Sequence, residues 1–265
     1  MRRDYHRWFS PALERDMELL VFGHAGARVL VFPTSMGRFY QWEDFGMINA
    51  VGDRVLVFPT SMGRFYQWED FGMINAVGDL LEAGSIQLIC VDSVDEESWY
   101  AKHKHPGDRA WRHEQYDRYV RDEVLPFSQW INPDPFLITT GTSFGAYHAV
   151  NFALKHPHRV GRVIGMSGLY DIRSYVYPHY DVNVYHNNPV DFIPNEVDPH
   201  RLEHLRRLDI ILAVGRDDRL RGSNEELSRK LWEKGIGNAL RVWDGWQHDW
   251  VYWYTMFRHF LPGHD

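Results

Sequence analysis

Short apolar runs bounded by turn-forming residues alternate along this chain with longer stretches in which apolar residues recur at helical spacing. The apolar runs predict strands at residues 17–22, 28–32 or 54–58, 86–91, 136–140, 162–167, 209–214 and 240–243. The longer stretches predict helices at residues 68–82, 110–127, 144–156, 224–234 and 250–259. Strands that alternate with helices in this way form a mostly parallel, twisted sheet with helices on both faces. The fold class is therefore α/β.

Two segments interrupt this alternation. The turn His24-Ala-Gly-Ala27 follows the first predicted strand closely, so we expect residues 17–22 and 28–32 to form an antiparallel hairpin at a sheet edge. Residues 170–199 are rich in Tyr, Asn, Asp and Pro and match neither the helical nor the strand period. Long connections of this kind are usually functional, and we expect this one to be a loop excursion over the mouth of the active site.

One segment of the chain occurs twice. Residues 28–53 recur without a change as residues 54–79. Repeat architectures share patterns rather than complete identity and generally need at least three units, whereas this is one identical pair. We interpret it as a tandem duplication of 26 residues, which leaves about 239 of the 265 residues (265 minus 26) for the ancestral fold.

The two copies compete for one place in that fold, and we expect the second to occupy it. If copy one docked, the insertion would break the helical pattern of Phe71, Ile74, Val77 and Leu81; if copy two docks, the insertion falls in the turn at residues 24–27. The displaced copy one is apolar, so we expect it to pack on the surface or to pair with another subunit as an added edge strand. The duplicated segment, residues 28–79, would then be the site of a homo-oligomer.

Composition and charge indicate the number of domains and exclude some classes of partner. With 44% hydrophobic residues, the chain fits a single α/β domain over residues 1–265. A formal net charge of −7 without a basic block argues against nucleic acid as a partner. No apolar stretch approaches 18 residues and the N-terminus lacks an apolar core, so we predict a soluble, cytoplasmic protein without a membrane partner. The single Cys90 lies in a predicted strand and is expected to be a core residue.

The sharpest chemical signal is Gly141-Thr-Ser143-Phe-Gly145, which follows a predicted strand and precedes a predicted helix. In this context the G-x-S-x-G pattern forms a tight turn that projects the serine hydroxyl out of the sheet, and the flanking glycines permit the close backbone approach. We therefore predict that Ser143 is a nucleophile.

A serine nucleophile needs a histidine to take its proton and a carboxylate to orient that histidine. In the fold that carries this turn, the acid and then the histidine follow the serine along the chain. Asp217 and Asp218 stand at the end of the strand predicted at 209–214; we choose Asp218, with Asp217 as the alternative. His248 lies between the last predicted strand and the last predicted helix, and we assign it as the base.

The other histidines have no comparable placement. They include His24, His103, His105, His113 and His148. The pair His103-x-His105 has the spacing of metal ligands but lacks further ligands nearby, so we predict no metal site.

A developing oxyanion needs two main-chain donors. One is the N–H of the residue after the nucleophile, Phe144. The second is expected from the loop Pro-Thr-Ser-Met-Gly, which places it at Met62 if copy two docks or at Met36 if copy one does. Ser35 and Ser61 lie in the same loop and are expected to shape the turn rather than to attack substrate.

These residues give the chain a resemblance that spans nearly all of it apart from one repeat copy. It resembles the esterase-D-like branch of the α/β-hydrolases, which includes S-formylglutathione hydrolases, feruloyl esterases and mycolyltransferases. The segments that carry the resemblance are FPTS in the oxyanion loop, CVDSVDEESWY at 90–100, GTSFG at 141–145, MSGLYDIRS at 166–174, NNPVDFIPN at 187–195 and GWQHDW at 245–250. The resemblance implies the α/β-hydrolase fold, a triad of Ser143, Asp218 and His248, and hydrolysis of a small-molecule ester without a cofactor. The chain departs from many hydrolases in having Pro-Thr-Ser where they have His-Gly.

Two other functions fit the same residues. An acyltransferase would pass the acyl group from Ser143 to an alcohol or thiol instead of water. A binding or scaffold protein would keep the fold and lose catalysis, for example because the duplication disturbed the pocket. Covalent labelling of Ser143 separates the enzymes from the scaffold, and product analysis with an added alcohol separates the two enzymes.

Overall fold

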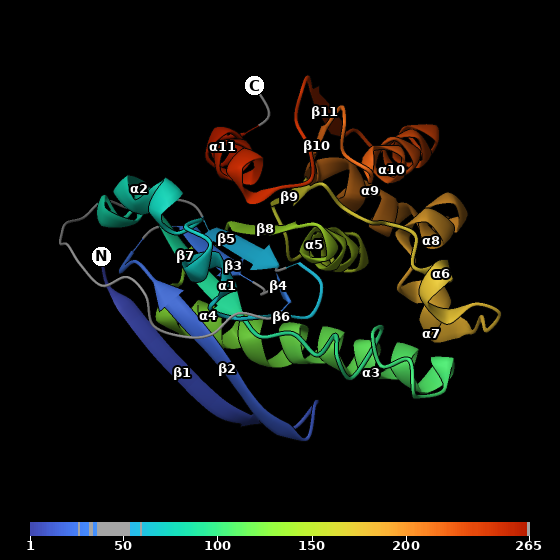
Figure 1. Ribbon diagram of the computed structural model, residues 1–265, viewed down its shortest axis with the longest axis horizontal. Coiled ribbons are helices and arrows are strands. Elements are labelled where there is room, and N and C mark those ends of the chain that lie inside the picture. The colour runs from blue at the N-terminus through green and yellow to red at the C-terminus, as the bar shows by residue number, and fades with distance from the viewer. Residues whose placement is uncertain (26, 32–33, 36–53, 59, 264–265) are drawn as a thin grey trace.

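The computed structural model describes residues 1–25, 27–31, 34–35, 54–58 and 60–263 of the chain (Figure 1). Nine strands form one sheet, which starts with an antiparallel edge of β1, β2 and β7 and continues as parallel strands. In spatial order the strands are β1 (Arg3–Ser10), β2 (Arg15–Phe22), β7 (Ile86–Val91), β3 (Ala27–Val31) and β5 (Arg54–Phe58) together, β8 (Leu137–Thr142), β9 (Arg162–Met166), β10 (Asp209–Gly215) and β11 (Ala239–Trp243). The mostly parallel sheet is therefore as expected from the alternation of strands and helices.

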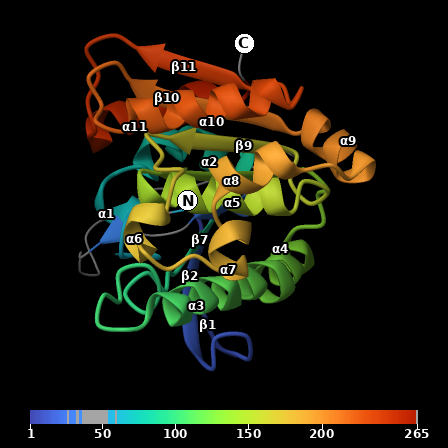
Figure 2. The same cartoon turned by 90° about the vertical axis from the view of Figure 1, so that its right-hand side faces the viewer.

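Helices cover both faces of the sheet (Figures 1 and 2). One apolar core lies under α3 (Pro106–Tyr119), α5 (Phe144–Lys155), α8 (Pro189–Asn195), α9 (Pro199–Arg207) and α10 (Arg221–Glu233). The other lies under α1 (Gln67–Asp70), α2 (Gly78–Glu82) and α11 (Trp250–Phe260). Because both faces of the central strands are covered, β7 and β8 are buried along their whole length, which explains their continuous runs of small and apolar residues.

The strands of the two repeat copies, β3 and β5, share one position in the sheet. Both pair in parallel with β7 on one side and β8 on the other, and in the same register: Val29 and Val55 both pair with Leu88 and with Ile138. Neighbouring strands lie about 4.8 Å apart, so one strand fills the space between β7 and β8. The two copies are therefore alternative occupants of a single position.

Beyond the shared strand, the second copy is built into the fold. Trp68, Met73, Ile74 and Val77 all lie in the core beneath α11. The equivalent residues of copy one fall within residues 36–53, outside the described part of the chain. Because β3 and β5 pair at the same place in the middle of the sheet, the position of a displaced copy, expected on the surface or as an added edge strand, stays a prediction.

Several predicted elements differ from the observed ones. The expected hairpin of residues 17–22 and 28–32 does not form, because β7 lies between β2 and β3. The helix predicted at 68–82 is interrupted at Gly72, whose φ of +75° is not helical, and continues as the 3₁₀ turn η1 (Asn75–Val77) and α2. The helix predicted at 110–127 starts earlier and passes through the π-helical turn η2 (Val120–Val124) into α4 (Leu125–Ile131). The short strands β4 (Thr34–Ser35) and β6 (Gly63–Arg64) pair with each other.

The segment 170–199, expected to be a loop, contains three short helices. They are α6 (Arg173–Val176), α7 (Val182–His186) and α8. None is longer than seven residues, which is too short for a hydrophobic period to emerge from the sequence. The segment closes one end of the molecule beside α3 and α5 (Figure 2).

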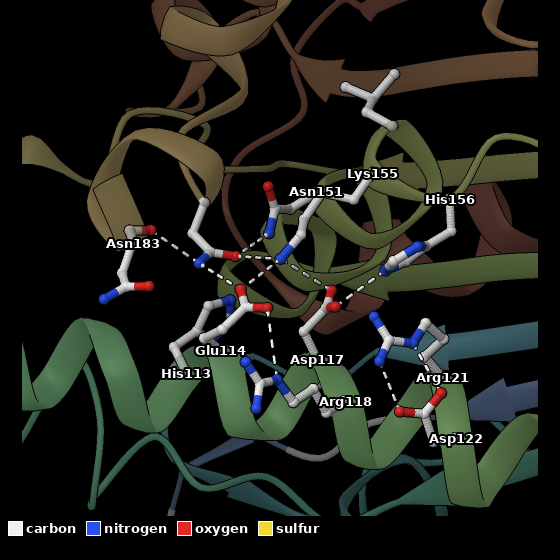
Figure 3. Close-up of polar contacts among 12 residues, drawn as sticks. His113, Glu114, Asp117, Arg118, Arg121, Asp122, Asn151, Lys155, His156 and Asn183 are labelled. Atoms are coloured by element: carbon white, nitrogen blue, oxygen red, sulfur yellow. Dashed lines mark hydrogen bonds and ion pairs between the residues drawn. The ribbon is translucent and has the colours of Figure 1, made fainter. Parts of the chain in front are cut away.

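A buried ionic network fastens this segment to the helices (Figure 3). Lys155 of α5 donates to Glu114 of α3 and to Asn187 at the end of α7, each at 2.9 Å. Lys155 also lies 3.3 Å from Asp117, which in turn bonds to His156 at 2.9 Å. Burial opposes ionisation of Asp117, but the Lys155 charge and the hydrogen bond from His156 outweigh it, so the pKa of Asp117 is lowered. Every charge in the network is therefore paired.

Candidate active site

Ser143 lies at the turn between β8 and α5. Its φ of 56° and ψ of −118° place its backbone in a region that few residues other than glycine adopt. The strained turn is held by its neighbours, since the Ser143 N–H donates to the Met166 carbonyl of β9 at 2.8 Å and the Ala146 N–H donates to the Ser143 carbonyl at 3.1 Å. The turn brings the Ser143 side chain to the wall of a cavity at the carboxyl end of the parallel strands.

The structure brings Ser143, His248 and Asp218 together. Nε2 of His248 lies 2.9 Å from Ser143 Oγ, and Nδ1 lies 3.0 and 3.1 Å from the two carboxylate oxygens of Asp218. An ionised carboxylate can only accept, so Nδ1 carries the imidazole proton and Nε2 accepts from the serine hydroxyl. The alternative acid, Asp217, is exposed.

Asp218 is ionised in this position. Its side chain is fully buried, which by itself raises the pKa of the carboxyl group. Hydrogen bonds from His248, from the Ser167 hydroxyl and from the Leu220 N–H at 2.8 Å outweigh burial, and the pKa lies below its ordinary value. Ser167 is itself held by the indole N–H of Trp253 at 3.0 Å. The acid is therefore a fixed negative charge beneath the imidazole.

His248 is positioned by close packing of its loop on the end of β10. A Cβ atom on Gly215 would lie 2.0 Å from the Trp246 carbonyl oxygen, so only glycine permits this approach. The N–H groups of Arg216 and Asp217 then donate to the carbonyls of Trp243 and Trp246, at 2.9 and 3.1 Å. This ties the loop that carries the histidine to the strand that carries the acid.

The loop expected to supply the second oxyanion donor is held in place by the buried carboxylate of Asp95. The N–H of Met62 donates to Oδ2 of Asp95 at 2.9 Å, and the other oxygen of this buried carboxylate bonds to His148 of α5. The Met62 amide therefore faces Asp95, which corrects its expected orientation toward Ser143. The residue of this loop that lines the cavity is Ser61. Met36 and its N–H lie outside the described residues.

A cavity of about 660 Å³ opens beside Ser143. It is lined by Ser61, Tyr100, Lys102, Arg109, Ser143, Phe144, Leu169, Ser174, Tyr175, Arg219 and Leu220. Ser174 and Tyr175 belong to α6, so the segment 170–199 contributes to the wall. The cavity is large enough for a small substrate and falls within the usual size range of ligand sites.

Two tyrosines form part of the cavity wall next to Phe144. The rings of Tyr100 and Tyr175 each lie 5.3 Å from the Phe144 ring, and their hydroxyls are 3.1 Å apart. The Ser61 hydroxyl also bonds to Tyr100. Burial raises the pKa of both phenols, so they are neutral hydrogen-bonding groups. The sequence shows aromatic residues at both places but does not connect them, because Tyr100 and Tyr175 are 75 residues apart along the chain.

Three other candidate histidines and Cys90 make contacts that support the fold. His105 accepts the Gly107 N–H at 3.1 Å and caps α3. His113 and His148 are buried and stack on each other at 5.2 Å, and Cys90 is buried in β7. Within the described ranges no three His, Cys, Asp or Glu side chains are grouped so that they could hold a metal ion.

Comparison with known proteins places the chain in a family. The sequence model of a family described as "Putative esterase" matches residues 63–263. A solved ferulic acid esterase is 21% identical, with 98% of this chain and 96% of that chain covered and a TM-score of 0.67. An S-formylglutathione hydrolase from Agrobacterium tumefaciens is 14% identical over 97% and 92% of the two chains, with a TM-score of 0.65. The Staphylococcus aureus serine hydrolase FphF, described as fluorophosphonate-binding, is 14% identical over 97% and 96%, with a TM-score of 0.63.

Two further findings complete the comparison. None of the curated protein sequences matched the chain. Among the helices that the structure describes, none is both long enough and apolar enough to cross a membrane. The structural similarities, all at low sequence identity, establish the α/β-hydrolase fold, and the family match covers most of the chain.

Proposed function

The chain belongs to the esterase family matched by residues 63–263, and from this premise we propose that it hydrolyses carboxylic esters through an acyl-enzyme on Ser143. The observation that carries the proposal is the chain of hydrogen bonds from Ser143 through His248 to Asp218 on the wall of a cavity. The order of these residues along the sequence is that of a triad on this fold.

In the proposed first step, Ser143 Oγ attacks the ester carbonyl carbon while its proton passes to Nε2 of His248. Asp218 does not take a proton; it stabilises the imidazolium and fixes its orientation. The proton on Nε2 then goes to the alkoxy oxygen as the ester C–O bond breaks, which releases the alcohol and leaves the acyl group on Ser143. Water, deprotonated by His248, then attacks the acyl carbon; the bond from that carbon to Ser143 Oγ breaks, Oγ takes the proton back from His248, and the acid is released.

The oxyanion that forms on the carbonyl oxygen needs two donors. One is the Phe144 N–H at the first turn of α5, where the helix dipole adds to the stabilisation. For the second we propose the main-chain N–H of Ser61 in place of that of Met62. The Ser61 residue lines the cavity, whereas the Met62 N–H is engaged by Asp95. The proposed chemistry is complete with these groups and requires no cofactor.

A fluorophosphonate probe together with Ser143→Ala tests the proposal. The probe should label the folded protein once, at Ser143, and Ser143→Ala should abolish labelling and lower kcat for ester hydrolysis by about 10⁴- to 10⁶-fold. Ser61→Ala provides a matched control, since it removes a hydroxyl from the same cavity and retains the triad. Turnover by Ser143→Ala above a few per cent, in a protein with an unchanged circular dichroism spectrum, would refute the nucleophile assignment.

A further inference from the structure

The cavity beside Ser143 carries positive charge on its wall. Lys102, Arg109 and Arg219 line it, and no Asp or Glu is among its described lining residues. The whole chain has a formal net charge of −7, so most of its surface does not attract anions. The two carboxylates that support the site are both buried. Asp218 is bonded to His248, and Asp95 is bonded to His148. The described lining of the cavity therefore carries a net positive charge.

Elsewhere in the described chain, many cations are paired with carboxylates. In the network of Figure 3, Lys155 is bonded to Glu114, His156 to Asp117 and Arg121 to Asp122. By contrast, within residues 1–25 and 60–263 no carboxylate forms an ion pair with any of the three cavity cations. The cavity therefore gathers positive charges that the protein itself does not neutralise.

Arg109 shows that this charge is built into the wall. The residue is 6% exposed, and its Nη1 donates to the carbonyls of Trp99 and Tyr175 at 3.3 and 2.9 Å. Its buried Nε has no hydrogen-bond partner among the described residues. Burying a guanidinium against carbonyls alone is costly, because carbonyl dipoles replace water but do not cancel the charge. An anion in the cavity would supply the missing counter-charge.

We propose that the ester hydrolysed at Ser143 carries an anionic group, a carboxylate or a phosphate, which binds to Lys102, Arg109 and Arg219. This inference rests on the proposed function, since it concerns the substrate of the same site. The ester carbonyl lies at Ser143 Oγ, and the anion lies along the cavity wall. Whichever of Tyr100 and Tyr175 accepts the hydrogen bond between their hydroxyls keeps its own proton to donate to the anion. Arg109 fixes the anion from within, while the exposed Lys102 and Arg219 attract it from solvent.

Two pairs of esters test the substrate class. Para-acetoxybenzoate and its methyl ester place the charge on the alcohol side of the scissile bond; the para-nitrophenyl monoester of adipic acid and para-nitrophenyl hexanoate place it on the acyl side. The measured quantity is kcat/KM for the anionic ester divided by that for its neutral partner. It is compared in the wild type, Lys102→Gln, Arg219→Gln and the double variant. The matched control is Lys104→Gln, an exposed lysine outside the cavity.

For at least one pair, the wild-type ratio should exceed one and should fall as NaCl is raised, because salt screens charges at the mouth of a cavity. Each single substitution at Lys102 or Arg219 should lower the ratio about three- to tenfold and the double variant further, whereas Lys104→Gln should change it less than twofold. The pair that responds shows which side of the ester carries the anion.

A ratio at or below one for both pairs, or one that the Lys102 and Arg219 substitutions leave unchanged, would overturn the inference. This failure differs from that of the proposed function. In the first case the protein still reacts with a fluorophosphonate at Ser143 and turns over neutral esters. In the second it does neither.

Discussion

Substitution of Trp68 can show which of the two repeat copies packs in the core. The Trp68 side chain is fully buried, and its ring meets that of Phe257 in α11 edge to face at 4.9 Å. Truncating a buried tryptophan to alanine costs about 3–5 kcal/mol of unfolding free energy. Trp42 is the same residue of copy one and lies outside the described part of the chain. With copy two docked, Trp68→Ala should be destabilising and Trp42→Ala nearly neutral.

Because the two copies are identical in sequence, copy one can replace a copy two that carries Trp68→Ala. This replacement limits the loss of unfolding free energy. With copy two docked, residues 23–53 connect β2 to β5: 31 residues, where a single-copy chain has five. The added loop-closure cost is (3/2)RT ln(31/5), about 1.6 kcal/mol. With copy one docked, the 26 residues 54–79 interrupt the segment leading into α2, at about (3/2)RT ln 26, or 2.9 kcal/mol. The exchange therefore costs about 1.3 kcal/mol plus the broken helix.

We therefore expect Trp68→Ala to lower the unfolding free energy by at least about 1.3 kcal/mol in the full chain, and by the whole 3–5 kcal/mol in a chain with one copy deleted. Deleting either copy yields the same sequence, so one single-copy chain suffices. Urea unfolding followed by far-ultraviolet circular dichroism measures all of these values without depending on tryptophan fluorescence.

Three results would refute this reasoning. A larger loss from Trp42→Ala than from Trp68→Ala would place copy one in the core. Small losses from both single substitutions, with a large loss only in the double variant, would mean that the copies exchange at no cost. A loss below about 1 kcal/mol for Trp68→Ala in the single-copy chain would contradict the packing argument itself.

Two further predictions concern the triad and the oxyanion donors. Asp218→Asn should lower kcat about 10³- to 10⁴-fold and Asp217→Asn less than tenfold. Because the folded pKa of Asp218 is depressed, its contribution to stability is present above its unfolded pKa of about 4 and is lost as pH falls through the folded pKa. The difference in unfolding free energy between wild type and Asp218→Asn should therefore shrink from pH 6 toward pH 3. A difference that grows on acidification would contradict the depressed pKa. Ser61→Pro, which removes the proposed donor N–H, should lower kcat about 10²- to 10³-fold, with Ser35→Pro as the matched substitution in copy one; equal loss from Ser61→Ala would assign the effect to the hydroxyl instead.

Most strands, and the three residues of the proposed triad that the structure brings together, could be predicted because their signals are local. The runs at 54–58 and 86–91 coincide with β5 and β7. β7 is buried along its whole length, and such strands are rich in apolar residues. Ser143 was identified by a five-residue pattern whose glycines and position after a strand are required by the turn. His248 followed from its place between the last strand and the last helix.

The misjudged elements depend on contacts between distant residues. β1 was not predicted because it is a sheet edge with exposed polar residues such as Arg3 and Arg7, and it becomes a strand through pairing with β2. The orientation of the Met62 N–H depends on Asp95, 33 residues further along the chain. The positive cavity is likewise formed by residues 102, 109 and 219, which nothing in the sequence connects.

The duplication and the proposed activity are compatible because of where the shared strand position lies. β8, which leads into Ser143, pairs directly with whichever copy fills that position. Because β3 and β5 pair with β8 in the same register, either copy presents the same hydrogen-bonding groups to Ile138 and Thr139, and the turn at Ser143 receives the same support. Asp218 follows β10 and His248 follows β11, and both strands lie on the far side of β9 from β8. An exchange of copies would therefore leave Ser143, His248 and Asp218 in place. Besides interrupting the segment that leads into α2, it would put the loop that carries Ser35 where the loop that carries Ser61 now lies. Its catalytic consequence should accordingly appear as weaker oxyanion stabilisation, which lowers kcat, and not in the labelling of Ser143.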